Sequence, residues 1–175
     1  MKRGCLSIVL CVVLVCSCGD GSGPGPGNGD DCGTCYSGFK CGNSGTCELN
    51  LSGFWVVTVT SGWVNEKQPN GSAWDSVGGL PDPFVCLTIN GNRGCTVAVQ
   101  NTTKPTWNGA FPKATATALQ TGVKVEYLDE DLSINDEICN ATTIAISAAN
   151  FKAGGVKITC GNPEYANFNM ALTAQ

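Results

Sequence analysis

Histidine is absent from the 175-residue chain, and charged residues make up only 14% of it. Without an imidazole, the chain lacks the base of Ser-His and Cys-His nucleophiles, the usual ligand of catalytic zinc and the usual pH sensor. The net charge of -4 argues against binding to nucleic acid, which needs a basic surface. These absences predict a protein that is not an enzyme and binds no nucleic acid.

The N-terminal apolar run, residues 6–16, is shorter than the roughly 20 residues that a membrane-spanning helix needs. It follows a positively charged start and is typical of a secretory signal. Residues 14–18 (LVCSC) resemble the bacterial lipobox. The resemblance implies that a signal peptide, residues 1–17, is removed and that Cys18 carries a lipid. The alternative is ordinary cleavage nearby, with Cys18 free or paired.

Residues 18–31 are expected to form a lipidated tether. Positions 19–31 hold six Gly, two Pro and three Asp and no apolar residue, so nothing offsets the entropy lost on ordering. A flexible chain of this length has an r.m.s. span of about 20 Å. Gly19 carries no obvious signal for inner-membrane retention. We therefore expect a lipoprotein of the bacterial cell envelope, held at the outer membrane on its periplasmic or its surface face.

The 12 cysteines indicate an oxidising compartment. Three leave with the signal and one takes the lipid, so eight remain in two even sets. The first set is Cys32, Cys35, Cys41 and Cys47. It lies in a small Cys-rich module, residues 32–49, which needs disulfides because it is too short to form a hydrophobic core. The CxxC spacing at its start also suits a zinc ligand pair or a redox pair. The compartment and the absence of a surrounding βαβ pattern favour disulfides over both.

Residues 53–175 are rich in Val, Thr, Ile and aromatic residues, with turn residues between short runs and no sustained helical periodicity. The pattern predicts an all-β fold, an eight-stranded antiparallel β-sandwich. The predicted strands are Trp55–Ser61, Phe84–Ile89, Cys95–Gln100, Ala110–Ala118, Val123–Leu128, Ala141–Ser147, Val156–Cys160 and Ala166–Thr173. Trp107 is expected to be a buried aromatic residue, with Asn108 in a turn.

One hairpin can be placed in register. Asn90-Gly91 is the preferred sequence of a two-residue type I′ turn, which puts Cys86 opposite Cys95. That pair is a non-hydrogen-bonded one, whose short Cα separation suits a disulfide. The second set of cysteines is thereby predicted to pair as Cys86–Cys95 and Cys139–Cys160. The two other pairings of these four cysteines remain as alternatives.

Acidic residues gather in two predicted loops. Asp75 and Asp82 lie in a Gly-rich loop before the second strand, and Asp129, Asp131 and Asp136 lie in the loop after the fifth. Two acidic loops in one sandwich repel each other unless a cation lies between them. Calcium prefers six to eight oxygen ligands in flexible geometry, so we predict a Ca²⁺ site. The alternative is a solvated acidic loop end that holds no metal.

Several motifs in order resemble those of a C2 domain across about residues 53–175: residues 56–60 (VVTVT), 77–85 (VGGLPDPFV), 102–108 (TTKPTWN), 127–131 (YLDED) and 135–138 (NDEI). The resemblance implies an eight-stranded antiparallel sandwich whose loops bind Ca²⁺ and bridge to phospholipid headgroups or protein partners. It also implies the calcium ligands: Asp75, Asp82, Asp129, Asp131 and Asp136. The loop between Asp131 and Asp136 is one residue shorter than is common, which makes Glu137 an alternative to Asp136.

The expected function is that of an envelope-anchored lipoprotein whose C2-like domain binds Ca²⁺ and docks to an anionic phospholipid surface or a partner protein. The basic patch with which some C2 domains bind phosphoinositides is absent, because Arg93, Lys104 and Lys113 are scattered. The alternative is a structural or adhesion lipoprotein that uses the sandwich as a scaffold and binds no metal. A hydrolase is disfavoured, because the chain offers paired Asp residues but neither His nor a recognisable nucleophile motif.

Overall fold

The computed structural model describes residues 32–75, 79–131, 135–161 and 164–175. The predicted signal, residues 1–17, and the predicted tether, residues 18–31, lie outside the described residues. The described strands are β1 (Phe39–Cys41), β2 (Cys47–Leu49), β3 (Phe54–Val64), β4 (Pro83–Ile89), β5 (Asn92–Cys95), β6 (Thr106–Ala110), β7 (Ala114–Thr115), β8 (Val123–Asp129), β9 (Asp136–Ile144), β10 (Gly155–Cys160) and β11 (Ala166–Ala174). Two short helices, α1 (Ala116–Thr121) and α2 (Ala148–Ala153), interrupt them.

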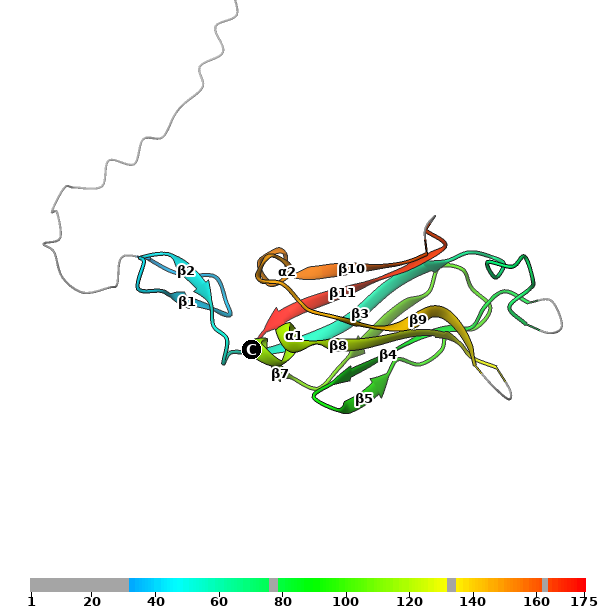
Figure 1. Cartoon of the computed structure of the whole chain (residues 1–175), viewed down its shortest axis with the longest axis horizontal. Helices are drawn as coiled ribbons and strands as arrows, with labels where there is room; N and C mark the ends of the chain where they lie inside the picture. Colours follow the sequence, from blue (N-terminus) through cyan, green and yellow to red (C-terminus); the bar gives the residue numbers. More distant parts are fainter. Residues whose placement is uncertain (1–31, 76–78, 132–134, 162–163) are drawn as a thin grey trace, which may run out of the picture.

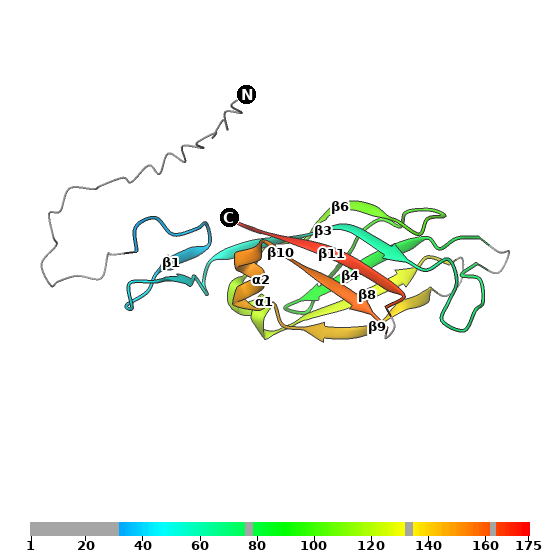
Figure 2. The ribbon, with the colours of Figure 1, turned by 90° about the horizontal axis from the view of Figure 1, so that it is seen from above.

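Two antiparallel sheets form the sandwich (Figures 1 and 2). One sheet has the order β10-β11-β3-β6, with the short β7 also on β3, and the other has the order β5-β4-β8-β9. The core lies between them because inward positions recur every second residue, as in β8, where Val123, Val125 and Tyr127 are buried. The expected all-β sandwich is confirmed.

Tyr127 is fully buried, and its ring meets those of Trp107 and Phe168 edge-to-face at centroid distances of 6.0 and 5.5 Å. Such edge-to-face pairs are the favoured geometry for buried aromatic rings. Trp107 is 8% exposed, which confirms it as a core residue. Asn108 lies inside β6 rather than in a turn.

Three of the predicted strands differ from the observed ones. β5 ends at Cys95, so residues 96–100 are not a strand. The predicted strand 110–118 contains the break between β7 and α1, where the Thr115 side chain accepts a hydrogen bond from Ala118 N and caps the helix. The predicted strand 141–147 ends early, because Ser147 caps α2 in a reciprocal capping box with Asn150. In the last two segments, local hydrogen bonds to the side-chain oxygens of Thr115 and Ser147 therefore outweigh the β propensity.

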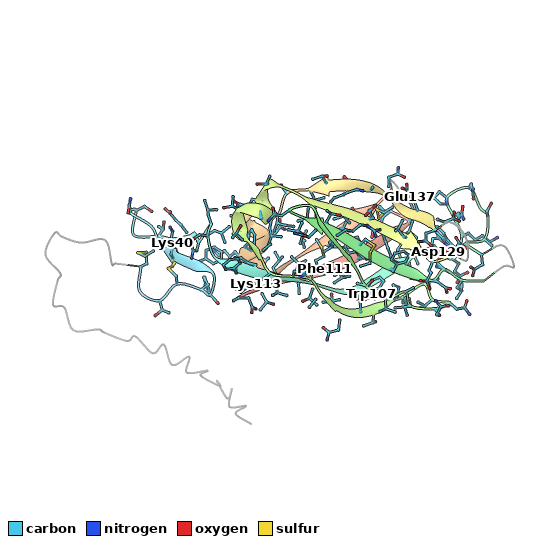
Figure 3. All side chains as sticks on the ribbon, turned by 90° about the horizontal axis from the view of Figure 1, so that it is seen from below. Lys40, Trp107, Phe111, Lys113, Asp129 and Glu137 are labelled. Carbon is cyan, nitrogen blue, oxygen red and sulfur yellow. A yellow bond between two sulfur atoms is a disulfide. The ribbon has the colours of Figure 1, made fainter. Side chains whose placement is uncertain are left out.

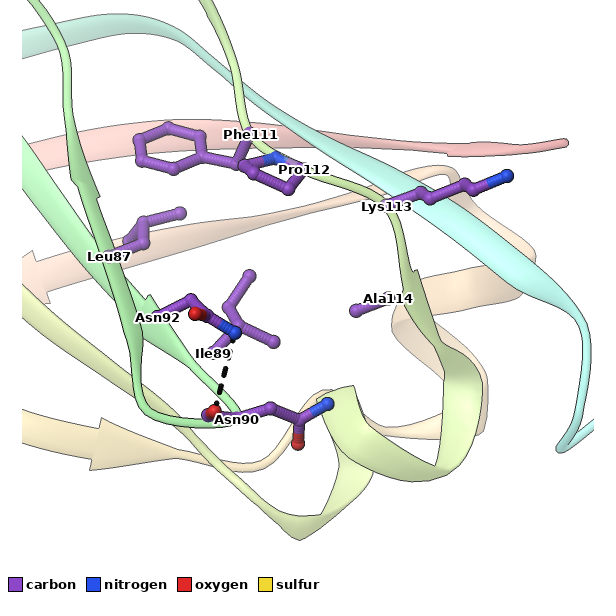
Figure 4. Close-up of a pocket in the computed structure, with 8 residues that line it drawn as sticks. All are labelled: Leu87, Ile89, Asn90, Asn92, Phe111, Pro112, Lys113 and Ala114. Atoms are coloured by element: carbon purple, nitrogen blue, oxygen red, sulfur yellow. Dashed lines mark hydrogen bonds between the residues drawn. The ribbon is translucent and has the colours of Figure 1, made fainter.

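The Asn90-Gly91 hairpin has the predicted register, with both central residues at positive φ (51° and 77°) and Cys86 opposite Cys95. Figure 4 shows its tip, where Asn92 Nδ2 donates to Asn90 O at 3.4 Å. The Cys86–Cys95 disulfide joins Cα atoms 4.0 Å apart, and Cys139–Cys160 joins β9 to β10, which belong to different sheets. Both disulfides match the pairing predicted from the hairpin.

The Cys-rich module has two disulfides, Cys32–Cys41 and Cys35–Cys47. Three of its sulfur atoms lie within 4.8 Å of one another, but all of them are in disulfides. They therefore offer no thiolate to zinc, and Cys32 and Cys35 do not pair with each other. The zinc and redox alternatives are not supported.

The module packs against one end of the sandwich, beside the C-terminus and both helices (Figures 1 and 2). Phe39 meets the buried ring of Trp55 edge-to-face at 6.4 Å, and Asn50 N donates to Gly38 O at 3.0 Å. Gly38 has φ +82°, and a Cβ atom placed there would lie 2.2 Å from Trp55 Cζ2. The absence of a side chain at Gly38 therefore permits the module to contact Trp55.

Gly38→Ala should destabilise the protein more than Gly45→Ala. Both glycines have positive φ, so each added Cβ costs about 1–2 kcal/mol in the backbone. Only at Gly38 does the Cβ also overlap Trp55, which adds about 1–3 kcal/mol. Urea denaturation followed by tryptophan fluorescence measures both losses, and equal losses would contradict the packing of Gly38 on Trp55.

Candidate metal centre

The acidic residues gather at the end of the sandwich opposite the Cys-rich module. The strand register brings them there: in the antiparallel sheet, Pro83 of β4 pairs with Asp129 of β8, and Asp129 pairs with Asp136 of β9. Asp82 directly precedes β4 and Asp131 follows β8. Figure 3 shows Asp129 at the far end of the molecule from Lys40 of the module.

Asp129 continues the inward-facing row of β8. Side chains two residues apart share a face of a strand, so Asp129 follows Val125 and Tyr127 into the interior and is 0% exposed. Its Oδ1 accepts a hydrogen bond from Asp82 N, whereas its Oδ2 is buried and has no hydrogen-bond partner in the described structure. A buried carboxylate oxygen without a partner is costly, and a cation would offset that cost.

The surroundings of Asp129 favour its neutral form when no cation is present. Burial raises the pKa of Asp129 to about 7, against the lowering effect of the hydrogen bond from Asp82 N. The negative charges of Asp131, Asp75 and Asp82 raise the pKa further. Carboxylates from both acidic loops therefore act on this one group.

Asp131 is affected in the same way. Burial raises its pKa, and the negative charges of Asp136 and Asp75 add to that rise. Its own backbone N–H donates to Asn135 Oδ1 at 3.0 Å, directly before β9. The two acidic loops thus repel each other, as the sequence predicts for a site that a cation would complete.

Asp75 and Asp136 each contact a residue that was not predicted as part of the site. A Cβ atom on Gly79 would lie 2.2 Å from Asp75 Oδ2, so this carboxylate lies directly against the Gly79 backbone. Gln68 Nε2 donates to Asp136 Oδ2 at 2.7 Å. Glu137, the alternative to Asp136, is exposed on β9 (Figure 3).

The carboxylates surround a common region without closing on one point. Among the described residues, no three of them bring one oxygen each within 4.8 Å of the others. Like charges without a cation are expected to stay apart. The donor set consists of five carboxylates on loops and strand ends. It fits Ca²⁺ better than the smaller Mg²⁺, which usually binds only one or two carboxylates, and better than softer ions, which prefer His or Cys.

Three cavities in the described structure contain no acidic side chain. One of about 60 Å³ lies between the β4–β5 hairpin and residues 111–114, with Leu87, Ile89 and Phe111 as its apolar lining (Figure 4). Another follows residues 96–100 and β6, and a third lies beside the turn at Gln68.

In the described ranges, neither helix has the length and apolarity to cross a membrane.

A family model of the C2 domain matches residues 56–160. Among solved structures, the chain is similar to a single C2 domain of a plant extended synaptotagmin 1, with a TM-score of 0.53 and 16% identity over 72% of this chain and 96% of that one. It is also similar to the calcium-bound tandem C2 domains of extended synaptotagmin 2, with a TM-score of 0.51 and 15% identity over 70% and 45% of the two chains.

Human GIVD cytosolic phospholipase A2 matches with a TM-score of 0.50 and 19% identity over 70% of this chain, but over only 17% of the phospholipase chain. The match thus spans less than a fifth of the enzyme. At these identities the likeness to solved structures shows the fold alone. A comparison with curated protein sequences finds no match.

The metal-free protein should lose stability as the pH rises from about 4 to about 7. In that window the folded Asp129 keeps a proton that the unfolded chain has lost, since its pKa is about 7 when folded and 3.8 ordinarily. The free energy of unfolding should therefore fall, by on the order of 4 kcal/mol at most. Asp129→Asn should flatten the dependence. Urea denaturation in EGTA across this range measures both curves, and parallel curves would rule out the effect.

Proposed function

We propose, from the premise that this chain belongs to the C2 domain family, that it is a non-catalytic Ca²⁺-binding lipoprotein of the bacterial cell envelope. Its acidic end would bind Ca²⁺ through Asp75, Asp82, Asp129, Asp131 and Asp136. C2 domains typically bind calcium and phospholipid membranes or proteins. In this chain, calcium would offer its remaining coordination positions to an anionic phospholipid or a protein partner.

The observation that carries the proposal is the Oδ2 of Asp129, which is buried and has no hydrogen-bond partner among the residues that the structure describes. Its partner atom Oδ1 is already held by Asp82 N, so the free oxygen has a fixed direction. Four further carboxylates lie on the adjoining loops and strand ends. A divalent cation would both bind this oxygen and neutralise the charge repulsion between the two acidic loops.

The position of the site suits a protein held by its N-terminus. The chain enters the described structure at the Cys-rich module, at the opposite end from the acidic loops (Figure 1). A lipid on Cys18 would therefore anchor the molecule by one end and leave the calcium site at the other. The docking surface would then face away from the point of attachment.

Calcium should stabilise the protein, and Asp129→Asn combined with Asp131→Asn should abolish the effect. With a Kd of about 10 µM, 1 mM Ca²⁺ would add about 2.7 kcal/mol to the free energy of unfolding. Calorimetric titration gives the affinity, and a thermal melt gives the shift. Glu48→Gln combined with Glu126→Gln is the matched control, since it removes two carboxylates outside the site and should leave binding intact.

A wild-type melt that does not move in millimolar Ca²⁺ would refute calcium binding and favour the metal-free scaffold. Repeating the calcium titration with anionic vesicles distinguishes a phospholipid surface from a protein as the docking partner. Tighter calcium binding in their presence supports a phospholipid surface, and unchanged binding supports a protein partner.

Cys18→Ser should abolish lipid attachment, because the thiol is the proposed acceptor. Expression in a bacterial host with radiolabelled palmitate, followed by detergent phase separation, measures it. The wild-type protein should carry label and enter the detergent phase, and the variant should do neither. Label that persists in Cys18→Ser would contradict the assignment of Cys18.

A further inference from the structure

Residues 101 and 102, between β5 and β6, carry no carboxylate, yet they bind the first acidic loop through three hydrogen bonds. Asn101 N donates to Asp82 Oδ1, and Asn101 Oδ1 accepts from Leu80 N at 3.0 Å. Thr102 N donates to Pro81 O at 2.8 Å. Three successive residues of the acidic loop, 80–82, are thus held by one short segment.

Asn101 makes two of these bonds from an uncommon backbone conformation. Its φ is 55°, in the left-handed region that Gly, Asn and Asp tolerate and other residues rarely adopt. In that conformation its N–H and its side-chain oxygen both bond the same loop. Asparagine therefore suits this position for two reasons: it tolerates the positive φ, and its side chain provides the oxygen that accepts from Leu80 N.

The hydrogen bonds of Asn101 continue to the centre of the acidic cluster. Asp82 accepts from Asn101 N on its side chain, and its own N–H donates to Asp129 Oδ1. We infer that Asn101 is a positioning residue of the calcium site of the proposed function. Its side-chain oxygen holds Leu80 N while its own N–H holds the Asp82 carboxylate, so the acidic loop is fixed at both residues. Through Asp82 it orients Asp129 so that Oδ1 is engaged and Oδ2 faces the cation.

Such positioning matters because the carboxylates repel one another before the cation arrives. A loop that is held in its binding geometry does not have to be ordered by the ligand, so more of the interaction energy contributes to affinity. Loss of one neutral hydrogen bond of about 1 kcal/mol corresponds to roughly a fivefold change in Kd.

Asn101→Gly tests the inference, with Asn90→Gly as its matched control. Glycine keeps the N–H and accepts positive φ, so the variant removes only the side-chain acceptor for Leu80 N. Asn90 also has positive φ (51°), but it lies in the hairpin of Figure 4, beyond the end of β4 that is away from Asp82. Calorimetric titration of Ca²⁺ into the chain without residues 1–17 should give roughly fivefold weaker binding for Asn101→Gly and unchanged binding for Asn90→Gly.

Two further measurements separate positioning from a general structural role. Hydrogen exchange at the Leu80 amide should speed up in metal-free Asn101→Gly and not in Asn90→Gly. Asn101→Asp, which keeps the acceptor, should bind Ca²⁺ at least as tightly as the wild type. Wild-type affinity in Asn101→Gly, or a lower melting temperature with unchanged affinity, would overturn the positioning role alone. A wild-type protein that binds no Ca²⁺ would overturn the proposed function and this role with it.

Discussion

The antiparallel pairing of β8 with β4 on one side and β9 on the other decides where the carboxylates of the site lie. Once Tyr127 is an inward residue of β8, the two-residue repeat turns Asp129 inward as well. The same register places Asp129 beside Pro83 and Asp136, so the loops that leave these strands start as neighbours. A one-residue slip would turn Tyr127 and Asp129 to the other face together. The apolar core and the candidate metal centre are therefore maintained by the same pairing.

The sequence predicts most of this sandwich because its strands are short runs rich in Val, Thr, Ile and aromatic residues, separated by turn residues. β4, β8, β10 and β11 lie within one or two residues of their predicted bounds, and the Asn90-Gly91 turn fixes a register that the Cys86–Cys95 disulfide matches. The two helices escaped prediction because each spans six residues, too few to show a helical period, and depends on a capping side chain, Thr115 or Ser147.

In the candidate site, the clustering of the acidic residues in the sequence predicted them, whereas the residues that hydrogen-bond to them were not predicted. Gln68 and Asn101 are uncharged and lie 68 and 19 residues from the carboxylates that they bond. Their hydrogen bonds arise from the tertiary fold, and no local pattern in the sequence marks them. Asn101 gave one weak signal, since asparagine in a polar turn tolerates positive φ. The pairing within the Cys-rich module was also beyond prediction, because four cysteines in 16 residues are compatible with every connectivity.

The lengthwise arrangement of the molecule has a mechanical consequence. β3 runs from the module end, where Phe54 and Trp55 begin it, toward the acidic end, and its hydrogen bonds to β11 and β6 lie across that direction. A pull between the N-terminal attachment and a surface held at the acidic loops would act along the strands. It would load these bonds in shear, all together, instead of opening them one after another. The Cys139–Cys160 disulfide, which joins the two sheets, would spread that load between both layers.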